Sequence, residues 1–165
     1  NLYVLDPLLG RILKYMPTNN LYTSPPHDYL APNQDVDLTG AVDMVIDGNV
    51  YVLYADGRVN KYFYGQGQPF TMQGLPSAMR GPTSIHVSGP PEPQGEGYVY
   101  VVDAGNERIV QFDKQGTYLR QFQARAGEPY FQQIRGIYVN EAENRLFVYS
   151  GNTLWLTTLP KLQSR

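Results

Sequence analysis

Two histidines are the residues of this sequence with the greatest potential for catalysis or metal binding, and His86 falls in strand-like sequence. Ser84 lies two positions earlier and therefore on the same face of an extended strand. Two strand residues span about 6.6 Å, which is too far for a direct Ser–His hydrogen bond and leaves a serine nucleophile unsupported. A catalytic zinc ion needs about three protein ligands, whereas two similar strands carry Val45 and Tyr138 at the position of His86. We therefore predict a packed or hydrogen-bonded histidine, with metal ligation as the alternative.

Charged residues interrupt two strand-like segments where the pattern is otherwise small or apolar. Asp43 aligns with Ser84, and Arg135 lies beside the equivalent position in a third segment. If these segments line a central channel, their first residues border its mouth. Asp43, Ser84, His86 and Arg135 are therefore the predicted ligand-binding residues. The alternative is a channel lined with hydrated polar groups, and no catalytic residue, metal site or cofactor is predicted.

The composition indicates a globular domain built from short strands and turns. Apolar residues make up 42% of the 165 residues and charged residues 17%, which excludes a disordered chain and a charged coiled coil. The 16 Gly, 13 Pro and 14 Tyr residues favour tight turns and strands over helices. A net charge of −2 gives no basic footprint for nucleic acid, and the absence of Cys excludes disulfides. No apolar stretch is long enough for this segment to insert into a membrane.

A hairpin pattern recurs about every fifty residues along the chain. The first strands of the four hairpins begin at Tyr3, Tyr51, Tyr100 and Leu146. The second strands open at Arg11, Arg58, Arg108 and Thr153, at intervals of 47, 50 and 45 residues. Gly, Asn and Asp fill the segments between them, and these residues tolerate the backbone conformations that tight turns require.

A further strand precedes three of the hairpins, and another strand follows the third hairpin. The preceding strands are Ala41–Asp47, Pro82–Ser88 and Ile134–Asn140, and the following strand is Gly116–Phe122. Four antiparallel strands in about 45–50 residues is the size of a β-propeller blade. We predict an all-β propeller segment of about four blades, partly incomplete, with approximate limits of 1–30, 41–75, 82–124 and 134–160.

The third unit, Tyr100–Asp113, closely resembles the NHL-type propeller repeat. That family has an apolar strand, an Asp, a turn with Asn, and an Arg before a second apolar strand, which here are Asp103, Asn106 and Arg108. The other units are degenerate, and the fourth lacks the Arg. The resemblance implies a propeller fold. Because the Arg recurs once per unit, we expect it to brace neighbouring blades and not to bind a substrate.

The blades at the two ends of the chain are incomplete. The first lacks its opening strand, and the last ends near Leu159 without a closing strand. An open arc leaves apolar blade faces in water, which promotes association. We expect a longer parent chain to supply more blades. A homodimer that closes the ring is the alternative.

Three segments suggest the context of the propeller. Ser24–Leu30, Asp37–Met44 and Gly48–Leu53 are together similar to C-terminal regions of bacterial, Chloroflexi-type, membrane-anchored proteins. Some of these proteins carry an upstream PPM-type phosphatase or Ser/Thr kinase domain. The resemblance implies a sensor or scaffold in an extracytoplasmic, cell-envelope location.

The predicted function is non-catalytic binding of a protein, peptide or carbohydrate. Aromatic side chains in loops are freer to stack on such a ligand than those in strands. The loop aromatics are Tyr22, Tyr29, Tyr64, Phe70 and Tyr130. A metal-dependent NHL-like enzyme of the lyase or lactonase type is the alternative function.

Overall fold

The computed structural model describes residues 1–32, 34–90 and 97–162. These residues form four antiparallel sheets, which confirms the prediction of an all-β protein. The helices among them are two three-residue 3-10 turns, η1 (Ala104–Asn106) and η2 (Pro129–Phe131). No helix in the described part of the chain has the length and apolar character needed to cross a bilayer.

The sheets follow one another along the chain, and we number them 1 to 4. Sheet 1 contains β1 (Leu2–Asp6), β2 (Arg11–Tyr15) and β3 (His27–Asp28). Sheet 2 contains β4 (Ala41–Ile46), β5 (Val50–Tyr54), β6 (Val59–Phe63) and β7 (Gln66–Gln68). Sheet 3 contains β8 (Pro82–Val87), β9 (Tyr98–Asp103), β10 (Arg108–Asp113) and β11 (Tyr118–Gln123). Sheet 4 contains β12 (Ile134–Asn140), β13 (Arg145–Ser150) and β14 (Thr153–Thr158).

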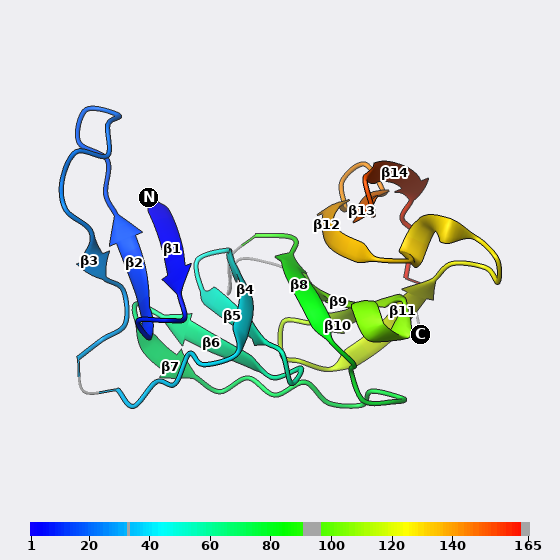
Figure 1. The fold of residues 1–165 in the computed structure, drawn as a ribbon, viewed down its shortest axis with the longest axis horizontal. Coiled ribbons are helices and arrows are strands. Elements are labelled where there is room, and N and C mark those ends of the chain that lie inside the picture. The colour runs from blue at the N-terminus through cyan, green and yellow to red at the C-terminus, as the bar shows by residue number, and fades with distance from the viewer. Residues whose placement is uncertain (33, 91–96, 163–165) are drawn as a thin grey trace.

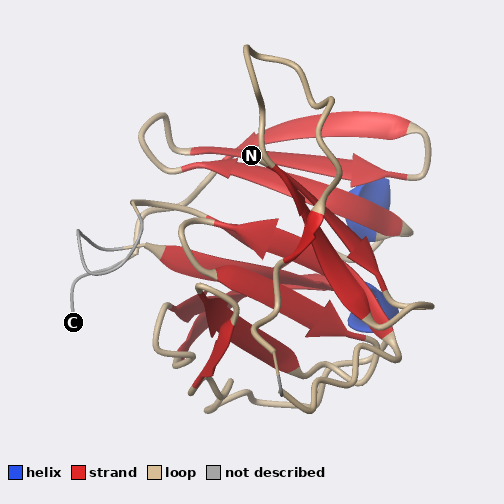
Figure 2. Ribbon diagram, turned by 90° about the vertical axis from the view of Figure 1, so that its left-hand side faces the viewer, coloured by secondary structure: helices blue, strands red, loops and turns tan. Residues whose placement is uncertain are grey.

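The four sheets are arranged side by side in an arc, and within each sheet the strands keep their order in the chain (Figure 1). The strands β1, β4, β8 and β12 lie on the concave side of the arc (Figure 1). Among these, β8 packs against both β4 and β12. Viewed from the side, the sheets form successive layers (Figure 2).

The first strand of sheets 2, 3 and 4 carries a bulge at the same place. In each case one extra residue interrupts the pairing with the second strand, and these residues are Val42, Thr83 and Arg135. All three are exposed. A shared bulge confirms the sequence alignment of the residues that follow it, namely Asp43, Ser84 and Gly136.

The predicted alignment of the fourth hairpin is wrong by one residue. Val45 pairs with Tyr51, and His86 pairs with Tyr100. In sheet 4 the equivalent Tyr138 pairs with Phe147, whereas the sequence alignment placed Leu146 there. The run from Leu146 onward is apolar at successive positions, so its pattern alone does not distinguish the two faces of the strand.

Three hydrophobic cores lie between the sheets, one at each junction. The strand β5 illustrates the arrangement, because all five of its residues are buried. Val50 and Val52 join the core shared with sheet 1, whereas Tyr51 and Leu53 join the core shared with sheet 3. The inner sheets are therefore buried on both faces, and removal of this apolar area from water stabilises the stack by about 25 cal/mol per Å².

The outer faces of the two end sheets remain open. On sheet 4 the exposed apolar residues are Tyr138, Tyr149, Leu154 and Leu156, and on sheet 1 they are Leu2 and Val4. The cross-strand pair of Tyr149 and Leu154 makes the sheet 4 residues a continuous patch. Within the described residues nothing covers either face, in agreement with the expectation for an open arc.

Candidate functional site

The four predicted ligand-binding residues lie on three neighbouring strands, but Asp43 is used inside the fold. Its carboxylate accepts hydrogen bonds from the backbone N–H groups of Met44 and Ile85, both at 2.8 Å. Because Ile85 belongs to β8 and Asp43 to β4, this contact braces sheet 2 against sheet 3. A charged hydrogen bond of this kind explains an acidic residue at the start of an otherwise apolar strand.

His86 makes the packed contacts expected of a structural histidine. Its Nε2 atom lies 3.3 Å from both the backbone N and the backbone O of Val139 in sheet 4. Its ring packs edge-on against Tyr138 at a centroid distance of 5.3 Å. Burial lowers the pKa of His86, and the contact with Val139 and the negative charge of Glu141 oppose this shift in part. Among the described residues, no three His, Cys, Asp or Glu side chains are grouped as a metal site would require.

Ser84 and Arg135 complete the predicted set without forming a common site with it. Ser84 is half-buried on β8, and Arg135 is exposed at the bulge of β12. The structure thus brings all four residues to the concave side of the arc. Two of the four side chains, Asp43 and His86, hold neighbouring sheets together there.

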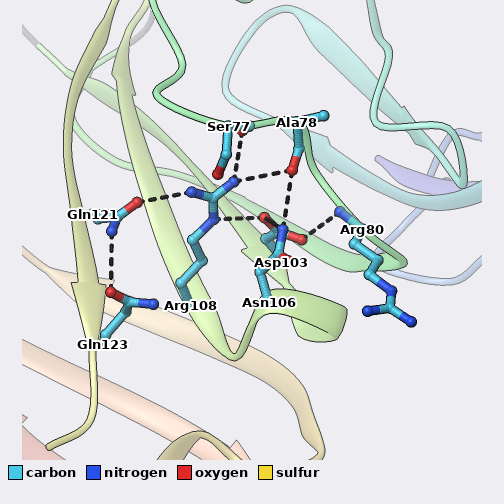
Figure 3. A network of polar contacts seen from close by, with 8 residues as sticks. All are labelled: Ser77, Ala78, Arg80, Asp103, Asn106, Arg108, Gln121 and Gln123. Atoms are coloured by element: carbon cyan, nitrogen blue, oxygen red, sulfur yellow. Dashed lines mark hydrogen bonds and ion pairs between the residues drawn. The ribbon is translucent and has the colours of Figure 1, made fainter.

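The NHL-like segment of sheet 3 forms a buried polar network at one end of the strands (Figure 3). Asp103 accepts from the Nε of Arg108 at 2.6 Å and from the backbone N–H of Arg80 at 2.7 Å. Arg108 also donates to the backbone oxygen of Ser77 and to the side chain of Gln121, both at 2.8 Å. Ser77 and Arg80 lie in the linker from sheet 2. The network therefore fastens that linker to sheet 3. The sequence analysis expected Arg108 to brace neighbouring blades, whereas its contacts are with the linker and with its own sheet.

A second polar network joins sheets 3 and 4 and contains Glu141, which the sequence analysis did not single out. The Tyr100 and Ser88 hydroxyls both donate to the Glu141 carboxylate, the second at 3.0 Å. The Gln111 side chain donates to the Tyr100 oxygen at 2.9 Å. Burial raises the pKa of Tyr100, and the hydrogen bond to Glu141 and its charge add to the shift. Since Tyr100 and Gln111 are fully buried, this network is a brace between sheets.

Another candidate site is a groove of about 540 Å³ between sheets 3 and 4, which we call the β14 groove. Its walls come from the end of β11, the following linker with η2, and the strands β13 and β14. The residues that characterise its lining are Phe122, Arg125, Glu128, Tyr130, Trp155 and Thr157. Apolar walls with a few polar groups in a volume of roughly 300–1,000 Å³ are typical of ligand-binding clefts.

Two aromatic residues dominate the β14 groove. Tyr130 and Trp155 pack edge to face at a centroid distance of 4.8 Å. The Tyr130 hydroxyl is hydrogen-bonded to the Glu128 carboxylate, which raises the pKa of Tyr130, and the carboxylate charge adds to the effect. The sequence analysis named Tyr130 as a loop aromatic available for binding. It did not single out Trp155, although its expectation that the last unit ends without a closing strand was a signal for an opening there.

Comparison with known proteins supports the fold alone. No family model matches the chain, and no curated protein matches it. The computationally designed Ika4 protein is similar in structure, with a TM-score of 0.54 and 17% identity over 92% of this chain and 81% of that one. The computationally designed Ika8 protein gives a TM-score of 0.51 and 18% identity over 90% of this chain. This chain spans 40% of the length of the Ika8 chain.

Proposed function

We propose that the four sheets are an arc of an NHL-type β-propeller and that the chain is a non-catalytic recognition module. The antiparallel order of the strands, the shared core at each junction and the recurring bulge all support a propeller. In the NHL-like segment, the Asp103–Arg108 pair serves to hold a linker, as a structural repeat motif would. Two of the polar side chains at the concave side, Asp43 and His86, are likewise engaged between sheets.

The observation that carries a binding function is the β14 groove. It combines an aromatic pair with charged groups at its rim, and Tyr130 is 38% exposed. Aromatic rings offer a large contact area at a small cost in side-chain entropy, and they stack on peptides and sugars alike. A protein, peptide or carbohydrate ligand is therefore our proposal for this groove.

In its biological context, we propose that the module is the sensor or scaffold part of a larger bacterial envelope protein in an extracytoplasmic location. The open apolar faces of sheets 1 and 4 support additional sheets that complete the ring. The oligomeric state of residues 1–165 tests this directly. A monomer agrees with completion by further sheets, whereas a stable dimer would favour ring closure by a second copy.

Fluorescence provides the test of the groove, since Trp155 is the single tryptophan of the chain. We would titrate the protein with a panel of extended peptides and linear oligosaccharides. We expect a saturable change in Trp155 emission with at least one class of probe. Replacement of Tyr130 by Ala should weaken that response, whereas Tyr64→Ala, at an exposed loop aromatic outside the groove, should not. Binding that leaves Trp155 unaffected would overturn the assignment.

A further inference from the structure

We propose that a groove beside β6 binds a free α-amino acid with a large apolar side chain. The groove has a volume of about 390 Å³, and we call it the β6 groove. One wall is the turn between β5 and β6 with the start of β6. The other wall is the linker from β7 to β8, which follows the convex side of the arc (Figure 1). This site is separate from the β14 groove, so the inference goes beyond the proposed function and does not depend on it.

The β6 groove begins where the fourth strand of sheet 2 stops short. The strand β7 pairs with β6 only as far as Gln68, which lies opposite Lys61. Pro69 follows, and a proline has no N–H group with which to continue the ladder. In sheet 3, by contrast, β11 continues to the first residue of β10, with Gln123 opposite Arg108. The short β7 thus leaves the first two residues of β6 beside a groove and not beside a strand.

The backbone of Val59 is the part of β6 that this arrangement leaves unpaired. The Tyr54 N–H donates to the Arg58 oxygen at 2.9 Å, so the backbone oxygen of Arg58 points towards β5. Backbone groups alternate in direction along a strand, and those of Val59 therefore point to the other side, on which Lys61 pairs with Gln68. Within the described chain no residue is hydrogen-bonded to them there. Because Val59 is buried, this favours an occupant that can hydrogen-bond.

Arg58 supplies the positive charge of the β6 groove. Its counterpart in sheet 3, Arg108, is buried, and the Nε and both terminal nitrogens of Arg108 are hydrogen-bonded. The side chain of Arg58 is 49% exposed, its Nε lies 3.5 Å from Asp56, and its guanidinium carbon lies 3.9 Å from the centre of the Tyr54 ring. Neither terminal nitrogen of Arg58 is hydrogen-bonded to another described residue. A guanidinium with free N–H groups binds a carboxylate through two parallel hydrogen bonds.

Acidic side chains beside Arg58 favour a zwitterion over a simple anion. Asp56 is exposed and lines the groove. Asp37 is also within electrostatic range: hydrogen bonds from Thr39 are the main cause of the lowered pKa of Asp37, and the positive charge of Arg58 adds to the effect. Two carboxylates near one guanidinium weaken its attraction for an anion alone. An α-amino acid meets both signs of charge, with its carboxylate at Arg58 and its ammonium group at Asp56.

The linker wall provides the apolar part of the site. Phe70, Met72, Leu75 and Met79 line the groove and are partly buried against the core between sheets 2 and 3. Methionine side chains are flexible and polarisable, so this wall adapts to apolar side chains of different shapes. The volume lies near the lower end of the range of roughly 300–1,000 Å³ for small-molecule sites, which suits a ligand of one residue.

Isothermal titration calorimetry of residues 1–165 with four small probes tests the proposal. We expect L-leucine to bind at one site per chain with a Kd of about 1 mM or tighter. Glycine lacks the apolar side chain, L-leucinamide lacks the carboxylate, and N-acetyl-L-leucine lacks the ammonium group. Each of these should bind about 10-fold more weakly. Binding of any one of the three as tight as that of L-leucine would overturn the proposal, and so would the absence of saturable heat up to about 10 mM L-leucine.

Two variants test whether the amino acid lies in the β6 groove. Arg58→Gln removes the guanidinium, and Asp56→Asn removes the carboxylate charge but keeps an oxygen that can accept from the Arg58 backbone N–H. Each should weaken L-leucine binding about 10-fold. Arg11→Gln is the matched control, because Arg11 is the exposed arginine at the same position of sheet 1 and lies outside the groove. It should change the affinity less than about 2-fold, and equal losses in Arg58→Gln and Arg11→Gln would overturn the assignment.

The emission of Trp155 separates this site from the β14 groove. Trp155 lines the β14 groove and lies outside the β6 groove, so L-leucine should leave its emission unchanged. A change in Trp155 emission that saturates together with the heat of L-leucine binding would place the amino acid in the β14 groove and would overturn the proposal.

Discussion

The same Asp–Arg pair occurs in sheets 1 and 3, in the same cross-strand register, and it does different work in each. Asp103 and Arg108 lie 2.6 Å apart with both side chains at most 3% exposed. Asp6 and Arg11 lie 3.4 Å apart with side chains 26% and 43% exposed. The difference comes from the linker that lies over the pair in sheet 3, whereas no described segment lies over the pair in sheet 1.

A junction between the second strand and the entering linker recurs in three of the four sheets. In sheets 2, 3 and 4 the last residue of the second strand is hydrogen-bonded to the linker that enters that sheet. Tyr54 donates to the backbone oxygen of Asp37 at 2.9 Å, and the Ser150 hydroxyl donates to that of Gln132. A Tyr, an Asp and a Ser thus perform one structural task, so the position within the sheet matters more than the residue type.

The largest loss of stability is expected when the buried ion pair of Asp103 and Arg108 is broken. Arg108→Ala leaves the Asp103 carboxylate in the interior without its cation, and we expect the free energy of unfolding to fall by about 3–5 kcal/mol. Chemical denaturation measures this value. Arg11→Ala is the matched control, and its effect should stay within about 0.5 kcal/mol because the pair is partly exposed. Equal losses in the two variants would contradict the role of the linker.

A smaller loss is expected for Gly105→Ala, which tests the close approach of the linker itself. The Gly105 N–H donates to the Arg80 backbone oxygen at 2.8 Å, and an added Cβ would lie only 2.5 Å from that oxygen. We expect a destabilisation of about 1–3 kcal/mol through strain at this contact. Gly136→Ala on β12 is the control, because its Cβ would meet no atom within 4 Å. A melting temperature that falls equally in both would contradict the argument.

Ser150→Ala tests a linker contact that involves no charged side chain. The substitution removes one neutral hydrogen bond to the Gln132 carbonyl. We expect a loss of about 1 kcal/mol, smaller than that of Arg108→Ala. Thr153→Ala, at the exposed position that pairs with Ser150, is the control. A loss from Ser150→Ala as large as that from Arg108→Ala would show that charge and burial do not set the strength of the junction.

The sequence predicts the strands and their equivalence well, because local patterns determine them. The alignment of Asp43 with Ser84 holds in the structure, since the bulge that precedes both is a local feature of the strand. The sequence alignment misplaced Phe147 by one residue. In that hairpin apolar residues occupy both faces of the strand, so burial depends on which sheet packs against each face. The neighbouring sheet, and not the strand itself, decides which apolar residues point inward.

The candidate site was less predictable, because it depends on contacts distant in sequence. Asp43 and His86 are unusual residues within their strands, yet their partners Ile85 and Val139 lie 42 and 53 positions away. Within the described residues no strand pairs with the outer edge of β14, and the β14 groove is bordered by that strand and by the linker before β12. Tyr130 alone could be named in advance, since an aromatic residue in a loop is visible in the sequence.

The smallest expected change in stability concerns the two histidines, one in sheet 1 and one in sheet 3. His27 on β3 is exposed, whereas His86 on β8 packs against sheet 4, and burial lowers its pKa. A lowered pKa means that below about pH 6.5, the ordinary value, the unfolded chain binds a proton more readily than the folded chain. The stability linked to neutral His86 is therefore complete above that pH and is lost as the pH falls through the folded-state pKa. We expect a loss of about 1 kcal/mol or less between pH 7 and 5.5, measured by denaturation at each pH.

Variants at the two positions separate this effect from that of the carboxylates, which titrate mostly at lower pH. His86→Gln should lower the stability at pH 7 and remove most of the change between pH 7 and 5.5. His27→Gln should leave that change in place, because its side chain lies on the open sheet. If the pH dependence disappeared with His27→Gln and persisted with His86→Gln, burial between sheets 3 and 4 would not be its cause. The histidine at the covered junction would then behave like a surface residue, and the contrast between sheets 1 and 3 would be confined to the Asp–Arg pairs.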